Sequence, residues 1–200
     1  MPDQLFFDND ETDLMFDAQL FERKRRVNQK IFELFEIIRL RLKDSSLHKQ
    51  FPFPEGTDYQ TGKISQGENY LGYPWVMLDF PRGFNKNAIF AFRTMFWYGH
   101  YFSAHMVIAG DGLSGVLSNV AEKLRRTPDA VQFSCYEDAW CHDINNSTYN
   151  QANQLSPETI KLHAARHGYI KLSIKTTETD TEKLATAVVA HYETMLQLLL

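Results

Sequence analysis

Residues 70–110 read YLGYPWVMLDFPRGFNKNAIFAFRTMFWYGHYFSAHMVIAG and decide the fold, because three runs within them are rich in residues that favour β-strands. The first run covers residues 73–80 and ends in Pro81-Arg82-Gly83, which is a turn signal. The second run covers residues 88–98, and the third covers residues 101–109. The three runs predict neighbouring strands of one sheet.

Gly99 and His100 alone separate the second and third runs, which predicts a two-residue type II′ hairpin with glycine at its first central position. The resulting register places four cross-strand pairs on one face: Tyr98 with Tyr101, Phe96 with Ser103, Thr94 with His105, and Phe92 with Val107. The other face receives Arg93, Met95, Trp97, Phe102, Ala104, Met106 and Ile108. Both faces are mainly apolar, so helices, a ligand or a partner chain must cover each of them.

Both faces of this hairpin offer candidate ligand-binding residues. Thr94, Ser103 and His105 form a small polar group inside an aromatic face, which is the usual form of a small-molecule site. A buried histidine that bonds its neighbours explains the same pattern. On the other face, Arg93 can bind an anion, or it can pair with Asp79 of the neighbouring strand and stack on an aromatic ring. The predicted ligand-binding set is Arg93, Thr94, Trp97, Tyr98, Ser103 and His105.

Helical signals precede the sheet. Residues 17–43 predict one long helix, because apolar residues recur there at helical spacing. Residues 1–16 before it are predicted as a frayed arm or cap, and residues 51–67 after it as a connecting loop. Residues 31–42 are so apolar that either the chain's own sheet or a second subunit must cover several sides of the helix, and a homodimer is one of these two possibilities.

Further elements follow the hairpin. Ser156-Pro157 predicts a helix start that runs to Gly168, and Thr179 with Glu182 predicts a capping box for the last helix. The other expected elements are a helix over 113–124, a strand over 131–136, a polar loop over 138–155 and a strand over 169–175. The fold class is therefore α+β in a single domain, 1–200: an antiparallel-rich sheet with strands at about 72–109, 131–136 and 169–175, a long N-terminal helix, two middle helices and a C-terminal helix.

Composition narrows the class of protein. The chain has 200 residues, of which 44% are hydrophobic and 23% charged, and this is typical of one compact domain. A formal charge of −4 predicts no nucleic-acid partner, and the run Arg23-Lys24-Arg25-Arg26 is the one concentrated basic patch. The start lacks a signal-peptide pattern and no apolar run approaches ~18 residues, so we expect a cytoplasmic bacterial-type protein with no membrane partner. Cys135 and Cys141 are expected as reduced thiols.

A glycine motif offers an alternative site. Gly110, Gly112 and Gly115 have the G-x-G-x-x-G spacing, after a predicted strand and at the start of a predicted helix, and Glu137 follows in the position of a ribose-binding acid. The sequence thus offers a nucleotide site at residues 110–115. Against it, the preceding strand belongs to an antiparallel hairpin, and Asp111 brings a negative charge and can instead cap the helix.

Metal and catalytic patterns are incomplete. Cys135, Cys141, His142 and Asp143 lie close together, and His163 with His167 has the i,i+4 spacing of two metal ligands. Neither set supplies a full ligand shell, and adjacent residues such as Cys141 and His142 cannot normally face one another as a catalytic pair. The sequence therefore predicts no metal, no cofactor and no catalytic residue.

One family resemblance can be stated on these elements. The predicted order of elements is a long helix, a Trp75-containing strand, Arg82-Gly83-Phe84, an aromatic strand ending near Gly99-His100, an apolar strand, and then a helix, strand, helix, strand and helix. This order resembles that of the bacterial YktB-like family. That family has no established activity. The resemblance implies a single α+β domain and disfavours a doubly wound nucleotide fold.

These observations predict a small-molecule or protein-binding module without catalysis. Two alternatives remain open at this point: a nucleotide-binding enzyme that uses the 110–115 turn, and a dimeric scaffold or interaction protein.

Overall fold

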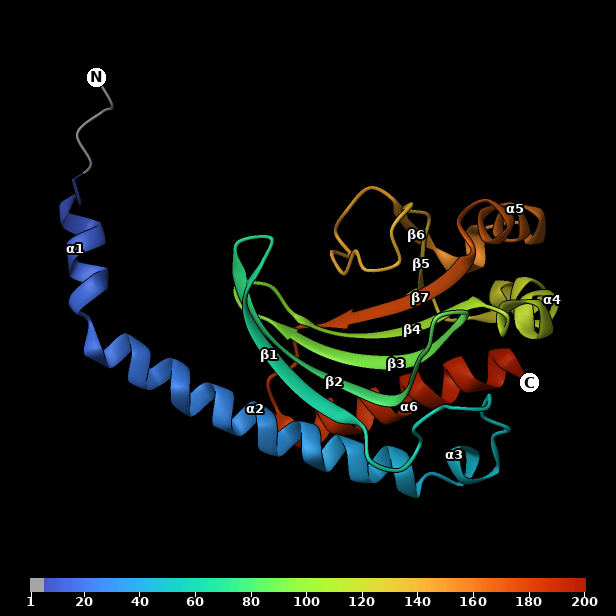
Figure 1. Ribbon diagram of the computed structural model, residues 1–200, viewed down its shortest axis with the longest axis horizontal. Coiled ribbons are helices and arrows are strands. Elements are labelled where there is room, and N and C mark those ends of the chain that lie inside the picture. The colour runs from blue at the N-terminus through green and yellow to red at the C-terminus, as the bar shows by residue number, and fades with distance from the viewer. Residues whose placement is uncertain (1–5) are drawn as a thin grey trace.

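The computed structural model describes residues 6–200, which form a seven-stranded antiparallel sheet and six α-helices (Figure 1). The strand order is β1-β2-β3-β4-β7-β5-β6. The strands are β1 (Lys63–Tyr70), β2 (Tyr73–Phe84), β3 (Ala88–Trp97), β4 (Phe102–Gly110), β5 (Gln132–Ser134), β6 (Tyr149–Gln151) and β7 (Tyr169–Thr176). The helices are α1 (Asn9–Phe16), α2 (Ala18–Asp44), α3 (Ser46–Gln50), α4 (Leu113–Lys123), α5 (Pro157–His167) and α6 (Thr181–Leu199). The predicted α+β fold class is confirmed.

Helices α2 and α6 cover one face of the sheet, as Figure 1 shows. From α2, the side chains of Phe35, Ile38 and Leu42 are fully buried against apolar residues of β2 and β3, including Phe80 and Phe92. One side of the apolar half of the long helix is therefore covered by the chain's own sheet and α6, whereas Ile37 and Leu40 are exposed. None of the helices within residues 6–200 has the length and apolarity needed to cross a bilayer.

The predicted turn at Pro81-Arg82-Gly83 was wrong, because strand β2 continues through these residues to Phe84. A bulge between Asp79 and Arg82 absorbs the proline, whose peptide bond with Phe80 is cis. The actual turn follows Phe84. There the Asn85 side chain accepts the backbone N–H of Ala88 at 2.7 Å, and this local bond closes the turn.

The β3–β4 hairpin has a loop one residue longer than predicted. The N–H of Trp97 donates to the carbonyl of Tyr101 at 3.0 Å, and the N–H of His100 donates to the carbonyl of Trp97 at 3.1 Å. Gly99 does adopt a positive φ, 75°. It occupies the second central position of the turn, where a type II turn also requires positive φ.

The extra loop residue shifts the predicted register by one. Arg93, rather than Thr94, lies opposite His105, and Met95 lies opposite Ser103. Because paired residues share a face, Ser103 and His105 lie on the face of Arg93, whereas Thr94 points to the helix side. The predicted division of the two faces was therefore wrong.

Other segments differ from the sequence prediction in places where the chain is polar. The predicted loop over residues 51–67 contains the start of β1, and the predicted loop over 138–155 contains β6. The predicted arm contains helix α1, whose Asp8 and Glu11 form a capping box, while residues 1–5 of that prediction lie outside the described residues. Helix α6 is capped by Asp180 rather than Thr179.

Candidate functional site

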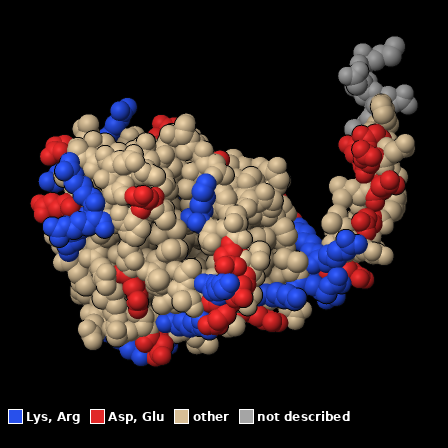
Figure 2. All heavy atoms as spheres, turned by 180° about the vertical axis from the view of Figure 1, so that it is seen from behind, with Lys and Arg blue, Asp and Glu red and all other residues tan. Residues whose placement is uncertain are grey.

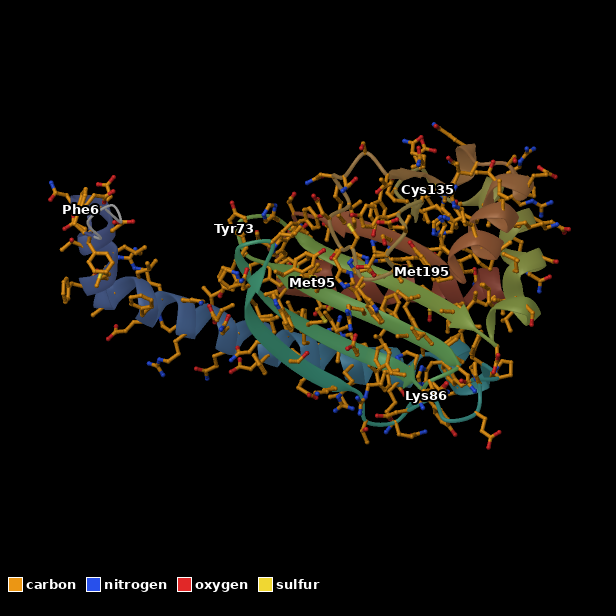
Figure 3. The ribbon with its side chains drawn as sticks, turned by 45° about the horizontal axis from the view of Figure 1, so that its top comes forward. Phe6, Tyr73, Lys86, Met95, Cys135 and Met195 are labelled. Carbon is orange, nitrogen blue, oxygen red and sulfur yellow. The ribbon has the colours of Figure 1, made fainter. Side chains whose placement is uncertain are left out.

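A long loop covers part of the sheet face that lies opposite α2 and α6. It comprises residues 135–148 between β5 and β6, and we call it the covering loop (Figures 1 and 3, where Cys135 marks its start and Met95 the face beneath). Three tyrosine hydroxyls bond its backbone: Tyr70 accepts the N–H of His142 at 2.6 Å, Tyr101 accepts the N–H of Ile144 at 2.7 Å, and Tyr149 donates to the carbonyl of Cys141 at 2.7 Å. Burial raises the pKa of Tyr70 to about 12, so it remains a neutral phenol at physiological pH.

A pocket of about 560 Å³ opens between this loop and strands β1–β3, and we call it the Arg93 pocket. Its lining residues are Ser65, Asn69, Tyr70, Trp75, Met77, Phe84, Arg93, Trp140 and His142. Besides the histidine, four of these residues are aromatic. The volume of the pocket is in the range of small-molecule sites. The lining thus combines apolar walls with a few polar groups.

Arg93 is the cation of this pocket, and it forms an ion pair with Asp79. Its Nε lies 2.6 Å from Oδ1 and its Nη2 lies 3.0 Å from Oδ2, a bidentate arrangement across the β2–β3 ladder. The side chains are 13% and 10% exposed. Trp140 of the covering loop lies over the guanidinium, 5.1 Å from ring centroid to Cζ. The predicted pairing with Asp79 is confirmed, as is the stacking of Arg93 on an aromatic ring.

His142 bridges Arg93 and Lys171. Arg93 Nη1 lies 3.0 Å from His142 Nε2, and Lys171 Nζ lies 3.0 Å from His142 Nδ1. Because arginine can only donate, Nε2 must be the acceptor and Nδ1 must carry the proton of the neutral imidazole. Burial lowers the pKa of His142 well below its usual value, and the Arg93 guanidinium adds to the effect, so the neutral form is the one present.

This arrangement fixes the protonation state of Lys171. With Nδ1 of His142 donating, Nζ must accept, which requires the lone pair of a neutral amine. The two N–H groups of that amine then donate to the carbonyls of Ala139, at 3.0 Å, and Cys141. With Lys171 neutral, its Nζ and both ring nitrogens of His142 have hydrogen-bond partners. Burial lowers the pKa of Lys171 to about 7, in agreement with the hydrogen-bond count.

His105 is a structural residue of the same face. Its Nδ1 lies 2.7 Å from Ser173 Oγ and its Nε2 lies 2.8 Å from Ser103 Oγ, so both ring nitrogens are engaged. Burial lowers its pKa well below the usual value, and its ring lies 4.7 Å from that of His142. A neutral, fully bonded imidazole supports its neighbours, which is the second of the two sequence interpretations for this histidine.

A larger cavity of about 890 Å³ lies elsewhere, where α2 meets α3. Most of its charged groups are paired: Arg41 bonds Glu182 and Lys49 bonds Asp44, while Lys43 bonds the carbonyl of Gln60. His48 at its wall engages Tyr192 and the carbonyl of Tyr59. Because the ion pairs there are largely exposed to water, whereas the Arg93 side chain is 13% exposed, the Arg93 pocket is the better candidate despite its smaller volume.

The structure divides the predicted ligand-binding residues between two places. Arg93, Trp97, Ser103 and His105 share the face beneath the covering loop, although of these only Arg93 lines the Arg93 pocket among residues 6–200. Thr94 is fully buried on the helix face. Tyr98 donates its hydroxyl proton to Asn28 of α2 at 2.7 Å. The corrected register explains both departures.

Sequence reasoning missed the contribution of other strands and of the covering loop. Trp75, Trp140 and Lys171 were not predicted as site residues, and His142 was considered only for metal binding or catalysis. For Lys171 the signal was weak, because Lys171 and Ser173 alternate with apolar residues as the solvent face of a strand does. They are buried because a loop thirty residues away in sequence lies over them.

The glycine motif is in a different structural setting from a nucleotide site. Gly110 ends β4, which pairs antiparallel with both β3 and β7, so the parallel βαβ unit of such sites is missing from residues 6–200. The N-cap residue of α4 is Gly112 rather than Asp111, so no side chain caps this helix. Glu137 is an exposed residue of the covering loop.

Gly110→Ala is expected to lower the free energy of unfolding by about 2 kcal/mol. Gly110 has a φ of 68°, and an added Cβ would lie 1.8 Å from the carbonyl oxygen of Asn87. Gly115→Ala is the matched control, because its Cβ would meet open space within α4, where alanine favours the helix. Urea unfolding of both variants tests this explanation, and similar stabilities would contradict it.

The histidine and cysteine sets remain incomplete in space. Within residues 6–200, no group of three or more His, Cys, Asp or Glu side chains is arranged to hold a metal ion. The rings of His163 and His167 lie 4.8 Å apart, and His163 also contacts Phe133 and Tyr169. The pair is packed among aromatic rings.

Comparison with family models, curated proteins and solved structures found no match for this chain.

Proposed function

We propose that this chain is a small-molecule-binding module whose ligand occupies the Arg93 pocket. One observation carries the proposal: Arg93 lies in an aromatic pocket, and within residues 6–200 its bonds to Asp79 and His142 use three of the five N–H groups of a guanidinium. The other N–H groups can donate to a ligand oxygen.

The lining favours a planar aromatic molecule with a carboxylate. Arg93 lines the pocket and Asp79 does not, so the ion pair presents its cationic end to a ligand. The rings of Trp75 and Trp140 supply flat apolar contact surface. The polar atoms of His105 and Lys171 are already used within the protein, which supports binding rather than catalysis.

The first test is calorimetric titration with 2-naphthoate and with 2-naphthalenemethanol, which has the same ring system without the carboxylate. We expect 2-naphthoate to bind at least about tenfold more tightly, because hydrogen bonds to a charged partner contribute about 1.5–3 kcal/mol. Trp140→Leu is expected to weaken 2-naphthoate binding about tenfold through loss of ring stacking. Trp140→Phe keeps an aromatic ring and is expected to retain most of the affinity.

Leu162→Ala provides a further control, because Leu162 is an exposed residue of α5 outside the pocket. Its affinity for 2-naphthoate is expected to equal that of the parent protein. Equal affinity for the two probes would contradict recognition by Arg93, and undiminished binding by Trp140→Leu would remove the pocket from consideration.

We further propose that the module works in the cytoplasm and shares its fold with the YktB-like family. Cys135 and Cys141 are free thiols in the structure, which supports a reducing compartment. The order of elements that suggested the family resemblance is also the order of the elements from α2 to α6, apart from the additional β1 and several short elements.

A further inference from the structure

The N-terminal part of the chain projects from the body as a helical arm, residues 6–30 (Figure 1). These residues include no buried side chain. The arm is joined to the body near its inner end, where Lys24 pairs with Glu68 and Asn28 bonds Gln66 of β1. Figure 3 shows Phe6 at the far end of the arm, well away from the sheet.

Large apolar side chains lie exposed along this arm. Those that are 49% exposed or more are Phe6, Phe7, Leu14, Met15, Phe16 and Phe21. In α2, Leu20 and Val27 extend the apolar stripe that is buried from Ile31 onward. The outer half of this stripe therefore passes beyond the chain's own sheet, and contiguous exposed apolar surface of this kind marks an interaction site.

Helix α1 also needs a packing partner. It has eight residues, and isolated helices shorter than about 12–15 residues are marginal in water. Its capping box adds some stability, but none of its residues is buried within the chain. A surface that packs against the apolar side of α1 would supply the burial that residues 6–200 do not give it.

The charges of the arm are divided between its two halves. Figure 2 shows acidic side chains along the outer part and basic side chains where the arm meets the body. The acidic residues of the outer part are Asp8, Asp10, Glu11, Asp13 and Asp17, and the basic run is Arg23, Lys24, Arg25 and Arg26. In a two-fold symmetric dimer, residue i meets residue j and residue j meets residue i. Two antiparallel arms would therefore bring each acidic half onto the basic half of the other.

We propose that the arm is a homodimer contact, in which two copies of this chain pair their arms antiparallel. The apolar side chains form the centre of the contact and the opposite charges fix its direction. A second copy fits better than an anionic membrane surface, because residues 6–27 carry six acidic side chains against four basic ones. The contact differs from the alternative in which residues 31–42 form the dimer interface, because most apolar side chains of that stretch pack in the chain's own core.

The test is a charge-exchange experiment on the full chain by light scattering after size exclusion. The parent protein is expected at twice the protomer mass of 23.3 kDa at micromolar concentration. The variant Asp10→Lys/Asp13→Lys and the variant Arg25→Glu/Arg26→Glu are each expected to be monomeric, because like charges then face one another. An equimolar mixture of the two variants is expected to form a heterodimer, and the variant with all four substitutions is expected to regain the homodimer.

Phe16→Asp/Phe21→Asp tests the apolar part of the same contact. Both side chains are exposed, 79% and 55%, so a folded monomer is expected, with far-ultraviolet circular dichroism reporting the fold. Leu162→Asp, at an exposed site on α5, is the matched control and should remain dimeric. A monomeric parent protein would overturn the proposal. It would also be overturned if either charge-reversed variant stayed dimeric by itself, or if the mixture of the two stayed monomeric. A parent protein that sediments with phosphatidylserine vesicles as a monomer would overturn it as well.

Discussion

Arg93→Met is expected to lower the free energy of unfolding by about 3–5 kcal/mol, because it leaves the carboxylate of Asp79 buried without its partner. Asp79 is 7% exposed, and Arg93 donates two of the hydrogen bonds to it. The loss is mainly the penalty of an unpaired buried charge. Urea unfolding at neutral pH measures it.

The double variant Asp79→Leu/Arg93→Met separates charge from packing. It removes both ions, so its stability is expected to return to within about 1 kcal/mol of the parent protein. Arg82→Met is the matched control, because the side chains of its ion pair, Arg82 and Asp58, are 35% and 27% exposed. This variant is expected to lower the free energy of unfolding by less than about 1 kcal/mol. A double variant as unstable as Arg93→Met would show that packing around the arginine, rather than its charge, is what stabilises the sheet.

Lys171 is expected to make the protein more stable as the pH rises above neutral. Its pKa is about 7 in the folded chain against an ordinary value of 10.5, so the unfolded state binds more protons between these two values. The contribution of Lys171 to stability therefore rises with pH across this window and is constant below it. The full difference is on the order of 5 kcal/mol, of which roughly 2 kcal/mol falls between pH 7 and pH 9.

Lys171→Met is expected to remove this rise, whatever its stability at pH 7. Lys175→Met is the matched control, because Lys175 lies four residues further along the same strand and on the same face but is exposed. The comparison should stop near pH 9. Burial raises the pKa of Tyr70 to about 12, so above pH 10 the unfolded state loses its phenol proton before the folded state does, and stability falls. Equal slopes for the parent protein and Lys171→Met would show that the lysine is charged when folded.

The elements that sequence predicts well are those with local signals. The start of α5 at Ser156-Pro157 and its end at Gly168 follow from capping chemistry, and the structure has both. The same holds for the long helix, whose apolar residues recur at helical spacing along most of its 27 residues. Edge strand β1 gave no such signal, because most of its side chains are polar and exposed or half-exposed.

The candidate site depends on two facts that local sequence does not contain. One is the position of Gly99 in its turn, because a shift of one residue moves His105 from the face of Thr94 to that of Arg93. The other is the path of the covering loop, which brings His142 and Trp140 over strands distant in sequence. Arg93 with Asp79 was predictable because adjacent strands were recognised, whereas Lys171 was not.

Strand β1 has one more consequence for the molecule, which concerns its behaviour when partly unfolded. It lies at one edge of the sheet, where unpaired backbone groups can recruit a strand from another molecule. Lys63, Glu68 and the irregular pairing between Gly67 and Tyr70 make this edge a poor template. Behind it, β2 is mostly buried and apolar. Strand β1 thus protects β2 from aggregation, and fluctuations that detach it would determine how long the protein survives in concentrated solution.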